Sequence, residues 1–252
     1  MIRWRFVFHG EIDGFSRTIV YLHCSTNNRS DTVLSLFLNA SQHFHLPRRV
    51  RSDHGIENIA VARHMLHHYG TLRNPVITRL SVHNQRIGTL WKDVDLYIIQ
   101  YFKNLFYYFE SHQKVDPINE VHLLALHLIY KHRINLAMDS FVEQWNHHPL
   151  STEANKSPYQ LWTEGFYNCA NSNHGAVLDL LSNPENVRNI GVDDEGPLPD
   201  IQTQNNVMVP EINVDLIRMT YITCKSWLNQ TFLIMNMVSR HIYWFVQKLK
   251  DF

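Results

Sequence analysis

The sequence predicts a mixed α/β fold. The evidence is the order in which strand-like and helix-like segments follow one another along the chain. Residues 3–9 and 17–24 are rich in β-branched and aromatic residues, with Gly10, Asp13 and Gly14 between them, which predicts an antiparallel hairpin. A helix, a short strand and a second helix follow. This order is typical of a sheet with helices packed on it, because such helices and strands bury their apolar faces against each other.

Several stretches carry the spacing of amphipathic helices, with apolar residues three and four positions apart. The expected helices run from Asp31 towards Pro47, over residues 57–69, over 84–109 and over 119–145. Residues 49–52 form a short strand between the first two. The stripe over 84–109 is the strongest of the four, and it predicts a helix with one face in the core. After Pro158 the helical pattern loosens.

The charge of the chain is balanced overall but uneven along its length. Lys plus Arg and Asp plus Glu both number 23 among 252 residues, which argues against a protein that coats nucleic acid. Up to Lys92, however, twelve basic residues stand against five acidic ones. Any contact with a polyanion is therefore expected in the first third of the chain, although a solvated basic face explains the same asymmetry.

Cysteine and histidine spacing predicts no metal site. Cys24, Cys169 and Cys224 are far apart and form no CxxC pair, which fits a reducing compartment. The 17 histidines lack Cys partners at ligand spacing, so we assign them structural or surface roles. No secretory signal is visible, and the apolar stretch 227–238 is too short and polar to span a bilayer. We expect an intracellular protein, nuclear or cytoplasmic, without a membrane partner.

These patterns divide the chain at about residue 165. Residues 1–165 hold the regular elements and form the expected core. Residues 166–252 form an extension that is partly helical and partly irregular. Within it, the segment 193–211 is acidic and contains proline, which is typical of an extended arm, and the tail after Met219 is apolar.

Four short motifs occur in order along the expected core. They are Asp13-Gly14-Phe15-Ser16-Arg17, Arg51-Ser52-Asp53-His54-Gly55-Ile56-Glu57-Asn58, Ser81-Val82-His83-Asn84-Gln85-Arg86-Ile87, and Trp145-Asn146 with Ser157-Pro158-Tyr159-Gln160-Leu161-Trp162. Together they resemble the catalytic core of retroviral-type integrases and transposases, over about residues 4–165. The closest resemblance is to vertebrate integrase-core proteins derived from mobile elements.

The resemblance implies an RNase H-like mixed sheet with flanking helices, in which the opening strand is central. This chain begins at about the second strand, so we expect that the opening strand and its Asp are missing. Two sheet edges would then be unpaired, which is a folding liability. On this basis we expect an N-terminally truncated product.

The resemblance also implies a site chemistry. In this family three carboxylates hold two divalent metal ions, which activate the attacking oxygen and stabilise the leaving one. It assigns Asp53 as a catalytic metal ligand at the end of a strand, while Gly88 occupies the position of the third carboxylate. Asp13 matches the hairpin turn better than it matches a ligand. With two of three ligands lost, we expect a degenerate DDE site that binds no Mg²⁺.

Three functions stay open on the sequence. The favoured one is an inactive integrase-like domain that binds DNA, with candidate phosphate contacts at Arg48, Arg49, Arg51, Arg79, Arg86 and Lys92. The second is an active Mg²⁺-dependent polynucleotidyl transferase with substitute ligands. The third is a protein-interaction module that uses the arm 193–211 to bind a protein partner. The sequence gives no oligomeric state.

Overall fold

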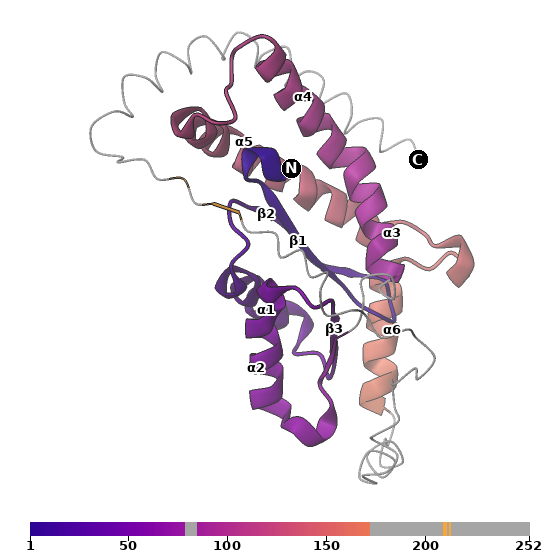
Figure 1. Ribbon diagram of the computed structural model, residues 1–252. Helices are drawn as coiled ribbons and strands as arrows, with labels where there is room; N and C mark the ends of the chain where they lie inside the picture. The colour runs from indigo at the N-terminus through magenta and orange to yellow at the C-terminus, as the bar shows by residue number, and fades with distance from the viewer. Residues whose placement is uncertain (79–84, 172–208, 211, 213–252) are drawn as a thin grey trace.

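The computed structural model describes residues 1–78, 85–171, 209–210 and 212. In chain order its main elements are β1 (Val7–Ile12), β2 (Ile19–Ser25), α1 (Ser30–Phe44), β3 (Val50–Ser52), α2 (Ile59–Tyr69), β4 (Val76–Thr78), α3 (Gln85–Val94), α4 (Gln100–Ser111), α5 (Glu120–His147) and α6 (Pro158–Asn171). Figure 1 shows the hairpin of β1 and β2 crossing the middle of the molecule, with α1 and α2 below it and α3 leading into α4 along one side.

Some predicted features lie outside this part of the chain. They are Arg79, most of the acidic arm 193–211 and the tail after Met219. Among the helices that are described, none combines the length and the apolar character that a membrane span requires.

The hairpin forms as the sequence predicts. β1 and β2 are antiparallel, with Phe8 opposite Cys24 and Gly10 opposite Leu22. The first strand begins later than expected, because Ile2–Trp4 form a 3-10 turn that ends at Arg5 in the left-handed region, with φ at 57°. This turn places the Trp4 side chain in the core, where it is fully buried.

The described strands form two separate sheets rather than one. β1 pairs with β2, and β3 pairs in parallel with β4, with Arg51 opposite Ile77. The sequence analysis did not predict β4, because three residues are too few to show the alternation of a strand. α2 connects β3 to β4, as the parallel pairing of two strands requires a crossover.

One continuous helical unit runs from Gln85 to Ser111 and confirms the strongest predicted stripe. Its buried side chains include Leu90, Val94, Ile98, Phe102 and Phe106. These residues are four positions apart, whereas an α-helix has 3.6 residues per turn, so the stripe would drift by about 40° per turn. The π-helical segment Asp95–Ile99, between α3 and α4, has a wider turn and keeps the stripe on one face.

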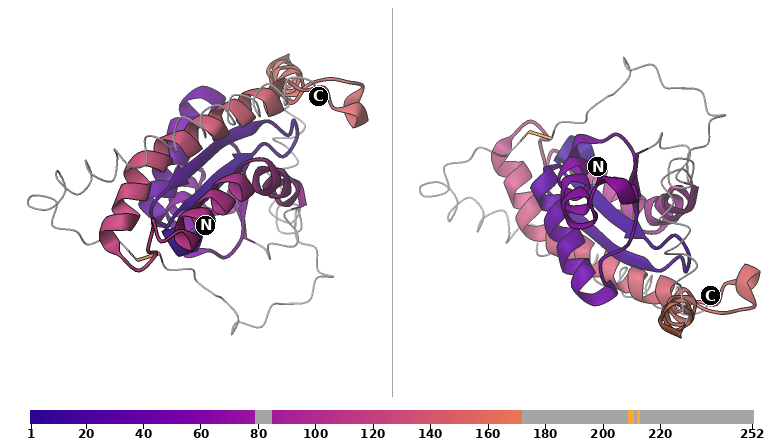
Figure 2. Two further views of the ribbon diagram at one scale, coloured as in Figure 1. Left: turned by 90° about the horizontal axis from the view of Figure 1, so that it is seen from above. Right: turned by 90° about the horizontal axis from the view of Figure 1, so that it is seen from below.

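α5 packs along the hairpin and covers the outer edge of β2 (Figure 2). The Asn135 side chain accepts a hydrogen bond from the Cys24 N–H at 2.8 Å and donates one to the Cys24 carbonyl at 3.0 Å. Asn146 makes the same pair of bonds to Ile19, at 2.8 and 3.1 Å. The asparagines are about three helical turns apart and project from one face of α5. Side-chain amides therefore occupy the edge that another strand could otherwise use.

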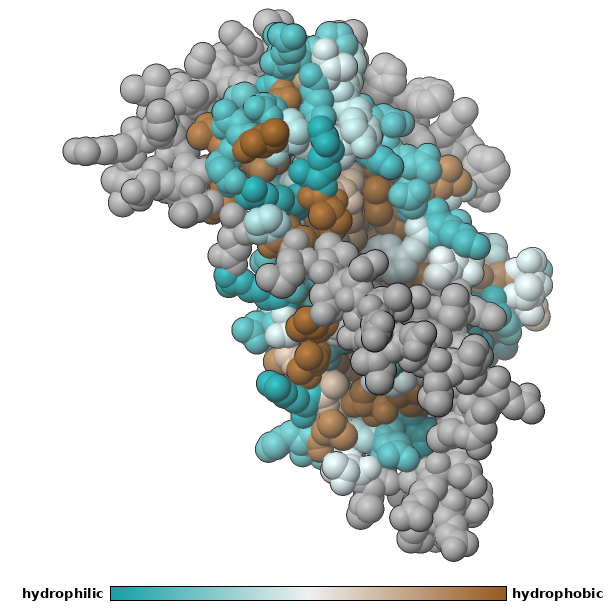
Figure 3. Space-filling model, in the orientation of Figure 1, coloured by the Kyte–Doolittle hydropathy of each residue, from teal (hydrophilic) through white to brown (hydrophobic). Residues whose placement is uncertain are grey.

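The buried side chains fall into two clusters. The large cluster joins the hairpin to α3, α4 and α5, and its largest members include Trp4, Phe6, Phe106 and Tyr130. The small cluster lies between α1 and α2 and consists of Val33, Phe37, Val61 and Met65. Figure 3 shows hydrophobic side chains at the surface of the lower part of the molecule, around α1, α2 and β3. Among the described residues, the small cluster has fewer buried members than the large one.

The apolar pattern loosens after Pro158, yet a helix follows, because α6 begins at that residue. Ser157 and Gln160 form a reciprocal cap: the Ser157 Oγ accepts from the Gln160 N–H at 3.2 Å, and the Gln160 Oε1 accepts from the Ser157 N–H at 2.9 Å. Proline at the first helical position favours the same start. Both signals are visible in the sequence and outweigh the weak apolar periodicity that follows.

Candidate nucleic-acid interface and carboxylate site

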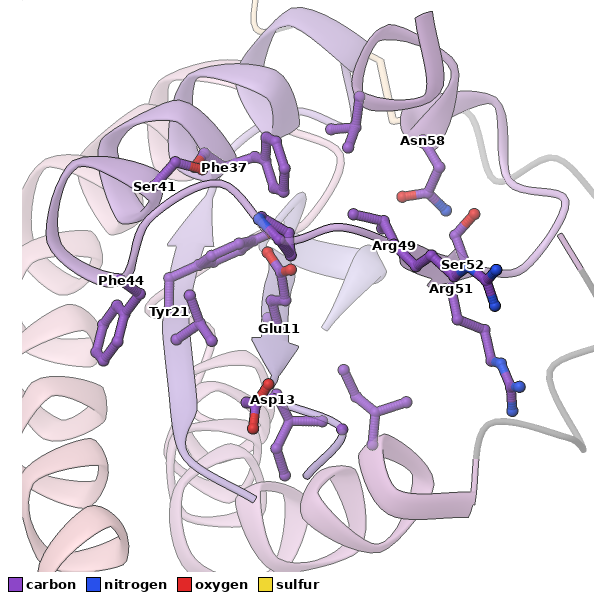
Figure 4. Close-up of a pocket in the computed structure, with 18 of the residues that line it drawn as sticks. Glu11, Asp13, Tyr21, Phe37, Ser41, Phe44, Arg49, Arg51, Ser52 and Asn58 are labelled. Carbon is purple, nitrogen blue, oxygen red and sulfur yellow. The ribbon is translucent and has the colours of Figure 1, made fainter. Parts of the chain in front are cut away.

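A cavity of about 710 Å³ lies between the two clusters of buried residues. One wall is the hairpin, through Gly10, Glu11 and Tyr21. The opposite walls are β3 and the apolar side chains of α1 and α2, and Arg86, Ile87 and Trp162 also line the space. Figure 4 shows the Glu11 carboxylate beside Tyr21, directed into the cavity towards the side where Phe37 lies. A space of this size falls within the range of ligand sites.

Asp53 follows the last residue of β3, as predicted, and caps the turn that comes next. Its Oδ1 accepts hydrogen bonds from the Gly55 N–H at 3.2 Å and from the Asn58 side-chain amide at 2.9 Å. This local pattern explains an aspartate at the position by turn chemistry alone. Both bonds use one oxygen, so the other carboxylate oxygen is left for a further contact. The role of Asp53 as a metal ligand stays a prediction.

Gly88 lies on an exposed turn of α3, close in sequence to the cavity residues Arg86 and Ile87. A Cβ built on Gly88 meets no atom within 4 Å, and its φ is not in the left-handed region. Neither strain nor close packing therefore requires glycine here, although glycine costs about 1 kcal/mol in a helix relative to alanine. The position has room for a Cβ among the described residues.

The structure gathers three of the predicted basic residues at the cavity. Arg49 and Arg51 reach it from the β3 segment and Arg86 from the start of α3, whereas Arg48 and Lys92 are exposed but do not line it. Within the described ranges, none of these five side chains takes part in an ion pair. The positive charge at the cavity is therefore available to an anionic ligand.

Three other arginines of the first third form ion pairs with glutamates. Arg3 pairs with Glu110 at 2.9 Å, Arg5 with Glu120 at 2.6 Å and Arg17 with Glu153 at 2.6 Å. Arg3 and Arg5 link the N-terminal turn to α4 and α5, and Arg17 links the hairpin turn to the segment Ser151–Glu153. The basic residues of the first third thus include three arginines in ion pairs, Arg3, Arg5 and Arg17, and three at the cavity without an ion pair among the described side chains, Arg49, Arg51 and Arg86.

Glu11 is a cavity residue that the sequence analysis missed. β1 places it opposite Tyr21. Burial, with a smaller contribution from the charge of Asp13, raises the pKa of Glu11 to about 7. Burial also raises the pKa of the Tyr21 hydroxyl. The signal that could have found Glu11 is an acidic residue inside an apolar strand, because strands are depleted in glutamate.

Asp13 closes the hairpin turn, as its sequence position predicts. Its Oδ2 accepts from the N–H of Phe15 at 3.1 Å and from the N–H and hydroxyl of Ser16, each at 2.7 Å. Asp13 also lines the cavity. Its hydrogen bonds account for the residue without a role in metal binding.

The comparison with known families agrees with this architecture. The sequence model of the integrase core domain matches residues 1–176, which is more than two thirds of the chain. The chain therefore belongs to the integrase core domain family, and its small sheets and packed helices are consistent with an RNase H-like mixed α/β fold. A search of curated proteins finds no match. The family expected from the four motifs is confirmed, and descent from a vertebrate mobile element stays a prediction.

Integrase cores generally depend on Mg²⁺, which carboxylates of this chain would have to hold. In the part of the chain that is described, no group of three or more His, Cys, Asp or Glu residues could hold a metal ion. Glu11 and Asp13 line the cavity, Asp53 does not, and Gly88 offers no side chain. These residues do not fit a site with two metal ions, which needs carboxylates around both.

Proposed function

We propose that the chain is an integrase-type core that binds the DNA backbone and does not cleave or join DNA strands. The observation that carries this proposal is Gly88, the residue at the position of the third carboxylate. Nothing in its packing or backbone demands glycine. The loss of the carboxylate is therefore a loss of a ligand and is not the consequence of a structural requirement.

The arginines at the cavity support DNA binding. Arg49, Arg51 and Arg86 have no ion-pair partner among the described side chains, and all three border one space. Arginine binds phosphate with two parallel hydrogen bonds, so such a cluster favours a polyphosphate backbone. Contacts of this kind carry no base sequence, and we expect binding without a defined target.

The activity test uses the purified chain, labelled duplex DNA, and Mg²⁺ or Mn²⁺. We expect neither cleavage nor joining. Gly88→Glu places a carboxylate at the expected position, with Gly88→Ala as the matched control for the removal of glycine. Strand cleavage by the unmodified chain that disappears in Asp53→Asn would contradict the proposal.

The binding test measures the Kd for a DNA duplex over a range of salt concentrations. Three phosphate contacts predict a slope of log affinity against log salt of about −3. Replacing Arg49, Arg51 and Arg86 together with alanine is expected to flatten that slope and weaken binding. Arg63→Ala, an exposed position on α2 away from the cavity, is the matched control. Equal losses in the two variants would exclude the cavity as the contact surface.

One observation favours the alternative, an active polynucleotidyl transferase with substitute ligands. Glu11 directs its carboxylate into the cavity that Asp13 also lines (Figure 4). If the unmodified chain shows metal-dependent cleavage, Glu11→Gln should abolish it, while Glu164→Gln on the exposed face of α6 should not. Retention of that activity in Glu11→Gln would remove the alternative.

The proposal also divides the chain at residue 165 into a core and an extension. It assigns the acidic arm 193–211 of the extension a role separate from DNA binding. Deletion of residues 193–211 should leave DNA binding unchanged, because the unpaired arginines lie in the core. If the arm binds a protein partner, a pull-down should depend on the arm and not on the core. Loss of DNA affinity on deletion would contradict this division of roles.

A further inference from the structure

A row of aromatic rings runs along α6. Tyr159, Trp162 and Phe166 are three and four positions apart, so they lie on one face of the helix. Tyr159 stacks on Trp162 with ring centroids 6.1 Å apart and planes at 23°, and Trp162 stacks on Phe166 at 5.8 Å and 15°. His147, at the end of α5, extends the row beyond Tyr159 at 5.6 Å, and His45 extends it beyond Phe166 at 5.7 Å. These five residues are called the aromatic row.

The aromatic row is open to solvent along most of its length. Tyr159 is 45% exposed and Phe166 is 48% exposed, and the two histidines of the row are exposed as well. Parallel rings whose centroids are this far apart are offset, so part of each ring face stays uncovered. Single exposed apolar side chains are ordinary, whereas a contiguous group of them is typical of a binding surface.

His45 takes its place in the aromatic row with a strained backbone. It follows the last residue of α1 with φ at 63° and ψ at 162°, a region that is essentially confined to glycine. A histidine in this conformation costs free energy that a glycine would not. Its ring nevertheless lies nearly parallel to that of Phe166, at 18°. Strained residues cluster at binding sites, so the backbone of His45 is a second sign that the row has a function.

The charges around the aromatic row favour an anion at its His45 end. Arg48 follows His45 by three residues, is exposed, and forms no ion pair or hydrogen bond with another described residue. The segment 42–49 contains no acidic residue. The acidic residues of segment 141–171 each lie 3.4 Å or less from a nitrogen of a basic side chain, and they are Glu143, Glu153 and Glu164. The guanidinium of Arg48 is therefore available to a negatively charged ligand.

Single-stranded DNA matches this surface with both of its parts. The flat face of a base stacks on an aromatic ring, and a phosphate binds a guanidinium. In a duplex the faces of each base are already covered by its neighbours, so the row favours unpaired strands. An apolar peptide would match the rings and leave Arg48 without a counter-charge, whereas a free phosphate would match Arg48 alone.

We propose that the aromatic row binds the unpaired bases of single-stranded DNA, with Arg48 on a phosphate of the same strand. The choice of DNA over RNA rests on the DNA binding proposed above, whereas the stacking itself does not depend on it. Every base has a flat face, so binding is expected without a defined sequence. The aromatic row is a surface separate from the arginines that are proposed to contact the duplex.

The test uses the full chain, fluorescence anisotropy and a labelled oligothymidylate of about twelve nucleotides, within the site size of proteins that bind single strands. An abasic strand of equal length has the same phosphates and no bases, and we expect it to bind at least about fivefold more weakly. Equal affinity for the two strands, or no binding of either, overturns the proposal. Tighter binding of oligouridylate than of oligothymidylate assigns the row to RNA and overturns it too.

Leucine variants remove a ring and keep an apolar side chain. Tyr159→Leu and Phe166→Leu should each weaken the binding of oligothymidylate by at least about fivefold and leave the binding of the abasic strand unchanged. Tyr167→Leu is the matched control, because Tyr167 is 61% exposed on α6 and meets Phe166 edge-on at 77°, outside the row. Equal losses in Tyr167→Leu and Tyr159→Leu overturn the proposal.

Arg48→Ala tests the phosphate contact. It should weaken the binding of both strands by a similar factor and reduce the slope of log affinity against log salt by about 0.7. Arg63→Ala, at an exposed position on α2, is the matched control. Equal salt slopes in the two variants overturn the assignment of a phosphate to Arg48.

Two measurements distinguish other occupants of the aromatic row. Urea denaturation should show only a small loss of stability in Tyr159→Leu, because the ring is half exposed. A loss as large as that of a buried ring shows that another part of the chain covers the row, and overturns the proposal. Sedimentation reports a second copy: a dimer of the free chain that Tyr159→Leu dissociates assigns the row to self-association and also overturns the proposal.

Duplex binding, measured on the same preparation, separates this proposal from the one above. Tyr159→Leu should leave duplex affinity unchanged, because paired bases cannot stack on the row. Duplex binding without a preference for oligothymidylate over the abasic strand refutes the aromatic row alone. Binding of oligothymidylate that depends on the rings, in a chain that does not bind duplex DNA, refutes the duplex contacts alone.

Discussion

The two clusters of buried residues each lie beside a two-stranded sheet, yet they differ in the number of buried side chains that they contain. In the large cluster Phe106 is fully buried and its ring contacts those of Trp4, Phe6 and Tyr130. The small cluster has four buried members among the described residues. Ile56, just before α2, is 49% exposed, and Ile59, at its start, is 42% exposed. Because more apolar side chains are buried in the large cluster, we expect it to contribute more to stability than the small one.

The difference also explains where the functional candidates lie. The unpaired arginines and Glu11 all border the cavity between the clusters. A region with few buried apolar contacts opens at a lower free energy than a well-packed core. The site is therefore attached to a stable hairpin on one side and to a less stable α1–α2 unit on the other.

The largest effect is expected from truncation in the large cluster. Phe106→Ala should lower the free energy of unfolding by about 3–5 kcal/mol, because it leaves a cavity among packed rings. Met65→Ala in the small cluster is fully buried too, but should cost about 2 kcal/mol, since its surroundings can collapse. Urea denaturation measures both. Equal costs would show that the clusters are equally well packed.

The next effect concerns the covered edge of β2. Asn146→Ala removes two hydrogen bonds and leaves the Ile19 N–H and carbonyl unpaired, so we expect a loss of about 2–3 kcal/mol. Asn104→Ala, on the exposed face of α4, is the matched control and should be nearly neutral. Faster hydrogen exchange at Ile19 in Asn146→Ala alone would confirm the cause. No difference between the variants would show that water replaces the amide.

A smaller effect is expected from Glu11 and depends on pH. Its pKa rises from the usual 4.5 to about 7, so between these values the native state holds a proton that the unfolded state has lost. The stability from protonated Glu11 is fully present below about pH 4.5 and is lost as the pH rises through 7. Glu11→Gln should remove this loss, for which a pKa rise of this size sets an upper bound of about 3 kcal/mol.

The measurement for Glu11 is the free energy of unfolding at pH 4.5, 6 and 8. Glu11→Gln is expected to gain stability relative to the unmodified chain as the pH rises across this range. Glu164→Gln, on an exposed side chain, provides the control profile. If the difference in the free energy of unfolding between Glu11→Gln and the unmodified chain does not change with pH, burial does not raise the pKa of this carboxylate.

The smallest effect is expected at the surface. Lys156 and Glu164 form an ion pair of 2.7 Å in which both side chains are well exposed. Lys156→Ala should therefore cost less than about 1 kcal/mol, and the cost should fall with added salt. Thermal unfolding at low and high salt measures it. If Lys156→Ala lowers the free energy of unfolding by more than this, and by the same amount at low and high salt, the docking of α6 contributes to the stability of the core.

Local sequence signals predicted most of the elements. The hairpin, α1, α2, the long unit from Gln85 to Ser111 and α5 were expected because each repeats its own apolar spacing over many residues. β4 has three residues, too few for a pattern. α6 was missed because its sequence signal is the N-terminal capping residue Ser157, and it lacks a strong stripe of apolar residues.

The candidate site was predicted in part. Asp53 at a strand end, Gly88 at the ligand position and the arginines were named from motifs, and the structure brings three of the arginines to one cavity. Glu11 was not found, although an acidic residue inside an apolar strand is a local signal; its pairing with Tyr21 and its burial became visible only in the structure. The turn chemistry of Asp53 also became visible only through its partners Gly55 and Asn58.

The sequence by itself determined the family and the kind of residue at each key position, because motifs and side-chain chemistry are local properties. The tertiary structure decided which of those residues meet. It showed that Gly88 is free of packing demands, that β2 is covered by amides from α5, and that β1 and β3 border one cavity. Contacts between residues far apart in the chain depend on how helices and strands pack, and no local pattern encodes that packing.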